Sequence, residues 1–380
     1  SYIGEDAFSQ VDTVSYGGFA VWQWWETQYW GALNFDEEGD DLYIIHNLEE
    51  LLYFRDSVKG IARLEADIDL STVCGRLGDE MVSFTPIKCL KFNGGNHTIS
   101  NLYINQPNSE NPIALFDNGT TGYRGGDKIS VKNLKVTNAY VKGGEKVAGI
   151  AINGDFVNCH FEGVVIGKYA GGISEYGKQS FAYNCSNYGM VVSTSFSTGI
   201  YASSMYNCYN RGRIVSDESA IGLGMYCCEH FNIYNSGDVY APDSKNIYYI
   251  ETDNCDDDSG SLFALQEMDS SAFLSGAVKD SLNKYVSQNP KAYDYYSDSI
   301  PLLQWVQGED GFPRFEGVDL KPTQGYVVRY TGAIEDLDAA HQWIFTTTKT
   351  AVGVEPVNAN VFGKNETRIV HRTNYQADAE

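Results

Sequence analysis

Through the middle of the chain, the hydrophobic and polar residues repeat as one short unit. Each copy opens on asparagine and closes on glycine, as in residues 158–163, which read NCHFEG, and residues 207–212, which read NCYNRG. The copies begin at positions 158, 184, 207 and 232, so they lie 26 (184 − 158), 23 (207 − 184) and 25 (232 − 207) residues apart. A unit this short cannot bury a core alone, so the copies must stack on one another.

Two further sets of residues, which we call columns, recur with about the same spacing as this unit. A glycine followed by an aliphatic residue recurs at Gly149, Gly172, Gly199 and Gly222. Two residues after each closing glycine stands a β-branched residue: Val165, Val191, Ile214 or Val239. Short β-rich runs bounded by turn residues are typical of strands, and the chain shows neither a helical stripe nor regular leucines. The pattern predicts an all-β fold, a right-handed parallel β-helix with three short strands per turn and a rise of about 4.8 Å.

The recurring asparagines, glycines and cysteines have expected roles in such a stack. Both asparagines and the glycine of NxxNxG are expected in turns, where left-handed or otherwise irregular backbone is tolerated. The asparagines should hydrogen-bond from repeat to repeat. A position that accepts Cys159, Cys185, Cys208 or Ile233 is an apolar interior one, so these cysteines are expected to be buried free thiols. Cys74 with Cys89 is a better candidate for a disulfide. No CxxC spacing indicates zinc, and the pattern leaves Cys227, Cys228 and Cys255 open.

The repeat extends upstream into a segment with a recognisable motif. Residues 92–104 read FNGGNHTISNLYI, which resembles the opening of bacterial GLUG-repeat proteins, and residues 147–151 and 170–174 resemble the glycine landmark of that repeat. With lead-in and exit motifs, the resemblance covers about residues 42–317. It implies a surface or adhesin-like protein, in a family without a shared reaction. The chain departs from the family where residues 113–116 read IALF instead of GLFG, and residues 193–206 are degenerate.

The sequence divides into four predicted parts. Residues 1–40 form an aromatic, acidic segment, residues 41–256 a cap helix and the β-helix, residues 257–317 a helical C-terminal cap and exit segment, and residues 318–380 a small β module. The cap helix is predicted from the capping residues at Asn47 to Lys59-Gly60. A second helix is predicted over residues 262–288, with a buried face of Leu274, Val278, Leu282, Tyr285 and Val286.

The C-terminal part leaves two interpretations open. Strands are predicted at residues 325–330, 343–348, 361–362 and 368–370. Residues 354–370 are similar to the start of the C-terminal sorting domains of type IX secretion, although a full domain is not present; an ordinary small β module is the alternative.

The charge of the chain and its first residue limit the binding partners and the cellular location that we expect. The chain carries 50 acidic and 27 basic side chains, a formal net charge of −23, and such an excess repels nucleic acid and anionic lipid. No run of 18 apolar residues is present, so no membrane span is predicted. The sequence starts at Ser1 without an initiator methionine, which fits a mature protein whose signal peptide has been removed. The expected location is extracellular or on a bacterial cell surface.

Candidate chemistry is sparse. Acidic residues do not recur at one column of the repeats, and the nearest catalytic pair is Glu162 with His160, which is better explained by solvated side chains, so no catalytic residue and no cofactor is predicted. Residues 36–41 and 253–258 are oxygen-rich but lack calcium-loop spacing, and charged loops without metal are favoured. The residues chosen as glycan-binding candidates are Trp22, Trp24, Trp25 and Trp30, whose rings can stack on sugars or pack on the repeats.

The functional prediction follows from these parts. We expect a non-enzymatic, secreted or cell-surface β-solenoid for adhesion, with a glycan or a host or bacterial surface protein as its partner. A carbohydrate-active β-helix enzyme, either a polysaccharide lyase or a hydrolase, is one alternative. A structural spacer is the other.

Overall fold

The computed structural model describes a mostly β protein. The described residues are 42–58, 60–117, 129–175, 180–224, 230–241, 243–245, 270–293, 299–323, 325–329, 345–347, 350–352 and 367–371. The chain divides into two compact units, residues 1–321 and residues 322–380.

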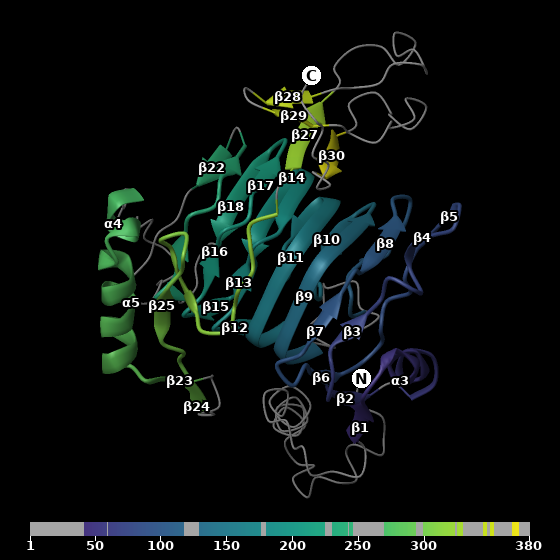
Figure 1. Ribbon diagram of the computed structural model, residues 1–380, viewed down its shortest axis with the longest axis horizontal. Helices are drawn as coiled ribbons and strands as arrows, with labels where there is room; N and C mark the ends of the chain where they lie inside the picture. Colours follow the sequence, from purple (N-terminus) through teal and green to yellow (C-terminus); the bar gives the residue numbers. More distant parts are fainter. Residues whose placement is uncertain are drawn as a thin grey trace, which may run out of the picture. The chain divides into compact units, whose positions relative to one another are not determined.

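The first unit contains one large parallel sheet of 20 strands (Figure 1). Its strands are β1 (Leu42–Ile45), β2 (Ile61–Leu64), β3 (Ile68–Asp69), β6 (Lys91–Asn93), β7 (Thr98–Ser100), β8 (Tyr103–Gln106), β9 (Ile129–Gly143), β10 (Lys146–Ala148), β11 (Gly154–Gly171), β12 (Phe181–Tyr183), β13 (Ser186–Asn187), β14 (Met190–Ile200), β15 (Ser204–Tyr206), β16 (Tyr209–Asn210), β17 (Ile214–Ser216), β18 (Ser219–Leu223), β19 (His230–Phe231), β20 (Tyr234–Asn235), β21 (Val239–Tyr240) and β22 (Asp243–Lys245). A small antiparallel hairpin, β4 (Gly75–Leu77) with β5 (Glu80–Val82), lies beside the first repeats.

Each strand pairs with the matching strand of the next repeat. The predicted β-branched column is confirmed, because Val191 pairs with Val165 on one side and with Ile214 on the other. Strands β15, β16, β17 and β18 pair with β19, β20, β21 and β22 in that order. A repeat therefore has four pairing positions, where the sequence predicted three. The additional strand is β18, which carries the glycine landmark. Residues 193–206, degenerate in sequence, are nonetheless paired within β14 and β15.

The interior of the repeats is one continuous apolar core from Ile45 to Val239. Cys159, Cys185 and Cys208 are fully buried free thiols in it, and Ile233 is 1% exposed, as predicted. The Cys159 Sγ–H donates to the carbonyl of Val131 at 3.3 Å. The thiols thus satisfy their one donor on backbone oxygens while packing as small apolar groups.

Cys74 and Cys89, the better candidates for a disulfide, are not bonded to each other. Both are buried free thiols, and burial raises the pKa of the Cys89 thiol. Each side chain is taken up by the apolar core, so no crosslink is needed to hold this region together. Cys227, Cys228 and Cys255 lie outside the described residues.

The N-terminal helix begins as predicted. It consists of α3 (Leu48–Tyr53), continued by a π-helical turn, η2 (Phe54–Val58), and the Asn47 side chain accepts the Glu50 N–H at 3.0 Å. Leu51 and Phe54 are fully buried in the core. Val58 is 37% exposed, contrary to the predicted face, because the π-helical turn changes the residue spacing.

The C-terminal helical region is two helices instead of one. Helices α4 (Ser270–Leu274) and α5 (Ala277–Gln288) are separated at Gly276, whose φ of 83° is left-handed. Val278, Leu282 and Val286 are buried as predicted, whereas Leu274 is 61% exposed because the break turns it away. Residues 262–269 of the predicted helix lie outside the described part.

Two antiparallel hairpins follow α5 and complete the first unit. They are β23 (Lys291–Tyr293) with β24 (Ser299–Pro301), and β25 (Trp305–Gln307) with β26 (Pro313–Phe315). We call residues 299–321 the strap. The Tyr285 ring of α5 stacks on Phe231 of the last repeat at 6.3 Å between centroids.

The second unit contains two antiparallel pairs. Strand β27 (Gly325–Arg329) pairs with β30 (Thr367–His371), and β28 (Phe345–Thr347) pairs with β29 (Thr350–Val352). Three of the four strands predicted here lie on these elements; residues 361–362 lie outside the described part. None of the described helices is long and apolar enough to cross a membrane.

Candidate functional site

A ladder of asparagine side chains runs along one side of the repeats. Its members have left-handed backbone, with φ between 52° and 60°: Asn133, Asn158, Asn184, Asn207 and Asn232. Each donates an Nδ2–H to the Oδ1 of the preceding repeat, and the Nδ2···Oδ1 distances are 2.7–2.9 Å from Asn158 onward. Asparagine is one of the few residues that tolerate this backbone region. The predicted stacking of asparagines is confirmed.

A second ladder joins the other asparagine of each unit, and the backbone of these residues is not left-handed. Asn187 donates to Asn210 at 2.7 Å and Asn210 to Asn235 at 2.6 Å, and neither these residues nor Gly212 have positive φ. Glycine is needed for close approach instead: a Cβ at Gly212 would lie 1.9 Å from the Gly189 carbonyl oxygen. The landmark glycines make room for this second ladder.

Aromatic rings flank the first ladder in the later repeats. On one side Tyr183 stacks on Tyr206 at 5.4 Å. On the other side Tyr209 stacks on Tyr234 at 5.2 Å, and the Tyr188 and Tyr209 hydroxyls are 2.9 Å apart. These rings face one another along the stack, so their faces are used for mutual packing instead of forming a flat platform for a sugar.

The strap lies on this ladder. The Asn184 Nδ2–H donates to the Pro301 carbonyl at 2.9 Å, and the Leu303 N–H donates to the Asn184 Oδ1 at 3.0 Å. One rung further, the Asn207 Nδ2–H donates to the Leu303 carbonyl at 2.9 Å, and the Trp305 Nε1–H donates to the Asn207 Oδ1 at 2.7 Å. The strap therefore contacts the asparagine amides through the backbone of Pro301 and Leu303 and through the indole of Trp305.

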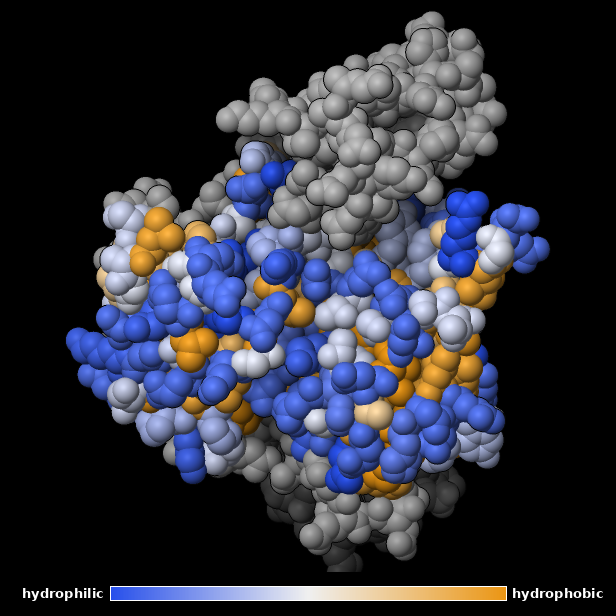
Figure 2. All heavy atoms as spheres, viewed as in Figure 1, coloured by the Kyte–Doolittle hydropathy of each residue, from blue (hydrophilic) through white to orange (hydrophobic). Residues whose placement is uncertain are grey.

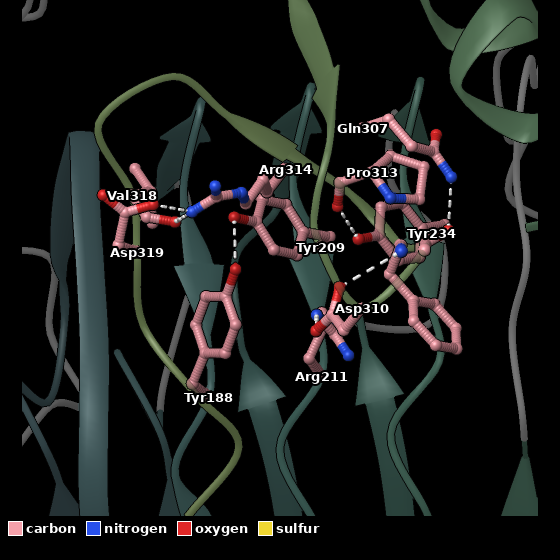
Figure 3. Close-up of polar contacts among 12 residues, drawn as sticks. Tyr188, Tyr209, Arg211, Tyr234, Gln307, Asp310, Pro313, Arg314, Val318 and Asp319 are labelled. Carbon is pink, nitrogen blue, oxygen red and sulfur yellow. Dashed lines mark hydrogen bonds and ion pairs between the residues drawn. The ribbon is translucent and has the colours of Figure 1, made fainter. Parts of the chain in front are cut away.

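Polar contacts at the end of the strap hold it in place (Figure 3). The Arg211 side chain is 8% exposed, and it pairs with Asp310 at 2.6 Å. Its guanidinium also lies 4.4 Å from the centroid of the Phe312 ring. The Tyr234 hydroxyl donates to the Pro313 carbonyl. The segment thereby fastens its second hairpin to the last repeats.

Glu162 and His160, the nearest candidates for a catalytic pair, are not brought together, and His160 is buried instead of solvated as expected (5% exposed). The Nδ1 of His160 lies 2.8 Å from the Ser186 Oγ, and within the described residues no hydrogen bond joins His160 to Glu162. Burial and the nearby Lys135 charge lower the pKa of His160 to about 3. A general base needs a pKa near the working pH and a partner that stabilises its protonated form, whereas Lys135 opposes protonation.

The other acids of the repeats have different surroundings. Glu145 pairs with Lys168 at 3.2 Å and Asp238 with Arg213 at 3.0 Å. Glu175 is 5% exposed, and burial raises its pKa to about 8. Its Oε2 has no hydrogen-bond partner in the part of the chain that the structure describes. Among the described residues, no group of three His, Cys, Asp or Glu side chains is arranged to hold a metal.

The tryptophans chosen from the sequence are not tested by this geometry. Trp22, Trp24, Trp25 and Trp30 lie outside the described residues, as do the acidic clusters at residues 36–41 and 253–258. Sequence reasoning predicted an exit segment in this stretch but missed its contacts with the ladder. A further signal in the sequence is the group of apolar rings at Trp305, Phe312 and Phe315 in a polar stretch.

Comparisons with known proteins add one distant likeness. No protein-family model matches the chain, and no curated protein matches it. A crystal structure from Bacteroides ovatus named "putative immunoglobulin A1 protease" aligns with 73% of this chain and 93% of its own, at 16% identity and a TM-score of 0.37. At this TM-score the likeness carries no argument about activity.

Proposed function

We propose that the chain is a non-enzymatic, right-handed parallel β-helix of the bacterial surface or exterior, which binds a glycan or a surface protein. Three observations support the β-helix: repeats of 23–26 residues, parallel pairing of matching strands in adjacent repeats, and one apolar interior. The resemblance to GLUG-repeat proteins supports the surface location, as does the net charge of −23. The face seen in Figure 2 is mostly hydrophilic, which fits an exposed stack.

The observation that carries the non-enzymatic proposal is the use of the buried polar groups. The ladder asparagines bond to one another and to the strap. The buried Asp155 accepts the Phe181 N–H at 3.0 Å, and His160 bonds to Ser186. Glycoside hydrolysis requires two carboxylates that flank one sugar site. The described repeats instead use their buried polar groups for structure.

One observation favours the alternative of a polysaccharide lyase or hydrolase. Glu175 has a raised pKa, and one of its carboxyl oxygens has no hydrogen-bond partner among the described residues; strongly shifted pKa values gather at active sites. A general acid alone does not complete glycoside hydrolysis, which also needs a second carboxylate at the same sugar site. We therefore rank this alternative second.

The two functions are separated by incubation with a panel of neutral and acidic polysaccharides. We expect binding without turnover. Turnover that disappears in the Glu175→Gln variant and persists in Glu145→Gln, an exposed control, would contradict the proposal. Glycan-array binding tests the partner: Trp24→Ala should remove a hit, whereas Tyr53→Ala, at an exposed ring far along the sequence (56% exposed), should leave it.

A further inference from the structure

We propose that the strap is an acid-sensitive cover, which stays closed against His160 while the imidazole is neutral and opens more often when the imidazole takes up a proton. The inference goes beyond the proposed binding function and does not depend on it. It rests on the groups that surround this ring while the strap is closed.

His160 lies between two neighbouring repeats and the strap. Its strand, β11, pairs with β9 and β13, which place Lys135 and Ser186 in register with it on either side. The Phe315 ring of the strap lies 6.1 Å from the imidazole, centroid to centroid, and is itself fully buried. The strap therefore supplies an apolar wall for a histidine that has little contact with water.

The groups around the ring favour its neutral form. The Nδ1 atom lies 2.8 Å from the Ser186 Oγ, and a hydroxyl can either donate to a neutral imidazole or accept from it. Burial and then the Lys135 charge lower the pKa of His160 from 6.5 to about 3. A proton on the ring under a closed strap would place a second positive charge beside Lys135 in apolar surroundings.

The charged groups at the end of the strap do not offset that charge. Arg314, the residue before Phe315, pairs with Asp319 (Figure 3), so this carboxylate already has a cation. Glu316 on the other side of Phe315 is exposed. Among the described residues, no ion pair joins His160 to a carboxylate. Protonation of His160 is therefore costly as long as the strap is closed.

Opening of the strap removes this cost. In water the imidazole has its ordinary pKa of 6.5, compared with about 3 when it is covered. The open state then binds the proton more readily between these values, so closure is most stable above pH 6.5 and weakens as the pH falls toward 3. This difference alone should raise the equilibrium constant for opening about 30-fold between pH 7.5 and pH 5.

The other titratable groups near the strap do not open it in this range. Burial acts to raise the pKa of Asp310, but its hydrogen bond with Arg211 holds the pKa below 3.8, so this ion pair persists at pH 5. Burial raises the pKa of Glu162, against the Lys321 charge, so acid favours the closed state there. Burial also raises the pKa of Tyr209, which stays neutral. An increase in opening at pH 5 therefore points to His160.

The test is hydrogen exchange of the full chain at pH 7.5 and pH 5, measured by mass spectrometry and corrected for the intrinsic pH dependence of exchange. The reporter is the peptide that contains Leu303, whose N–H donates to the Asn184 Oδ1. The reference is the peptide that contains Val191, whose N–H donates to the Arg213 carbonyl within the stack. Exchange detects openings that are rare, and we expect the corrected rate of the reporter to rise about tenfold or more at pH 5, while the reference is unchanged.

Two matched variants assign the effect to one histidine. His160→Gln keeps a polar side chain that cannot take up a proton in this range, and it should abolish the rise. His230→Gln is the control, since His230 is equally buried and burial lowers its pKa to about 4, but it lies on β19 in register with Met205. The rise should persist in this control.

The wild-type protein alone can overturn the proposal, so the test stays decisive if a variant does not fold. Equal corrected rates at Leu303 at both pH values would do so. Loss of protection at Val191 in step with Leu303 would also do so, because it would show acid unfolding of the whole stack. Persistence of the rise in a folded His160→Gln variant, or its loss in His230→Gln, contradicts the role of His160.

Discussion

At the residue scale, the fold depends on what each asparagine and glycine makes sterically possible. The first asparagine of the unit supplies both a left-handed turn and a ladder amide, as at Asn232, whose φ is 57°. The second asparagine supplies only an amide, as at Asn235. The closing glycine at Gly212 supplies neither, but lets two repeats approach each other. The three recurring residues of the motif thus meet three different physical requirements of the fold.

Glycine and alanine substitutions should separate the first two requirements. At Asn232 both changes remove the bond to Asn207, but alanine adds left-handed strain of about 1–2 kcal/mol. Urea unfolding should therefore show Asn232→Ala to be less stable than Asn232→Gly by about 1 kcal/mol. At Asn235, whose backbone is not left-handed, glycine should have no such advantage. Equal stabilities of the two Asn232 variants would contradict the account.

The buried Glu175 predicts a pH dependence. Its pKa rises from 4.5 when unfolded to about 8 when folded, because burial disfavours the carboxylate. The native state then binds more protons between these values, so this contribution to stability is full below about pH 4.5 and is lost as the pH rises through 8. Glutamine cannot ionise. Glu175→Gln should raise the free energy of unfolding by about 1–3 kcal/mol at pH 8 and by much less at pH 5.

Chemical unfolding at both pH values checks this expectation. The control is Glu145→Gln, since Glu145 is 47% exposed and paired with Lys168. The control should change stability little at either pH. An equal effect of Glu175→Gln at pH 5 and pH 8 would show that the carboxyl is not the cause.

At the element scale, the contacts between the strap and the asparagine ladder are what sequence reasoning could not find. The sequence repeat predicted the asparagine ladder, the β-branched column and the buried cysteines. Residues that recur at one spacing share one environment, so several copies indicate what that environment is. Residues 299–321 occur once, and apart from the Trp305 indole they hydrogen-bond to Asn184 and Asn207 through backbone atoms, which no side-chain pattern records. Helix α4 was misjudged for a related reason: Gly276 breaks an apolar periodicity that continues across it.

Removal of the ion pair between Arg211 and Asp310 should loosen the strap. Asp310→Asn leaves the Arg211 charge, which is 8% exposed, without its carboxylate. Because Asp310 itself is half-exposed, we expect a loss of about 1–2 kcal/mol instead of the larger cost of breaking a fully buried pair. Hydrogen exchange should rise within residues 299–318. Glu309→Gln, at the preceding acid, is the matched control and should not raise it; a strap equally protected in both variants would contradict this role.

At the scale of the first unit, the central claim is that consecutive repeats stack in parallel. Matching residues of neighbouring repeats then lie one strand spacing apart. Ile61 pairs with Lys91, Lys91 with Ser130, and Ser130 with Asp155. Two further steps lead through Phe181 to Ser204. The claim explains the interval of the repeats, the single core and the ladders together.

The most direct test is a distance across the stack. Nitroxide labels attached through p-acetylphenylalanine at positions 61 and 204, which avoids the native cysteines, can be measured by double electron–electron resonance. Five parallel steps of about 4.8 Å predict a separation near 24 Å, broadened by the label arms. A narrow distribution beyond about 35 Å, outside any five-step parallel ladder, would contradict the account.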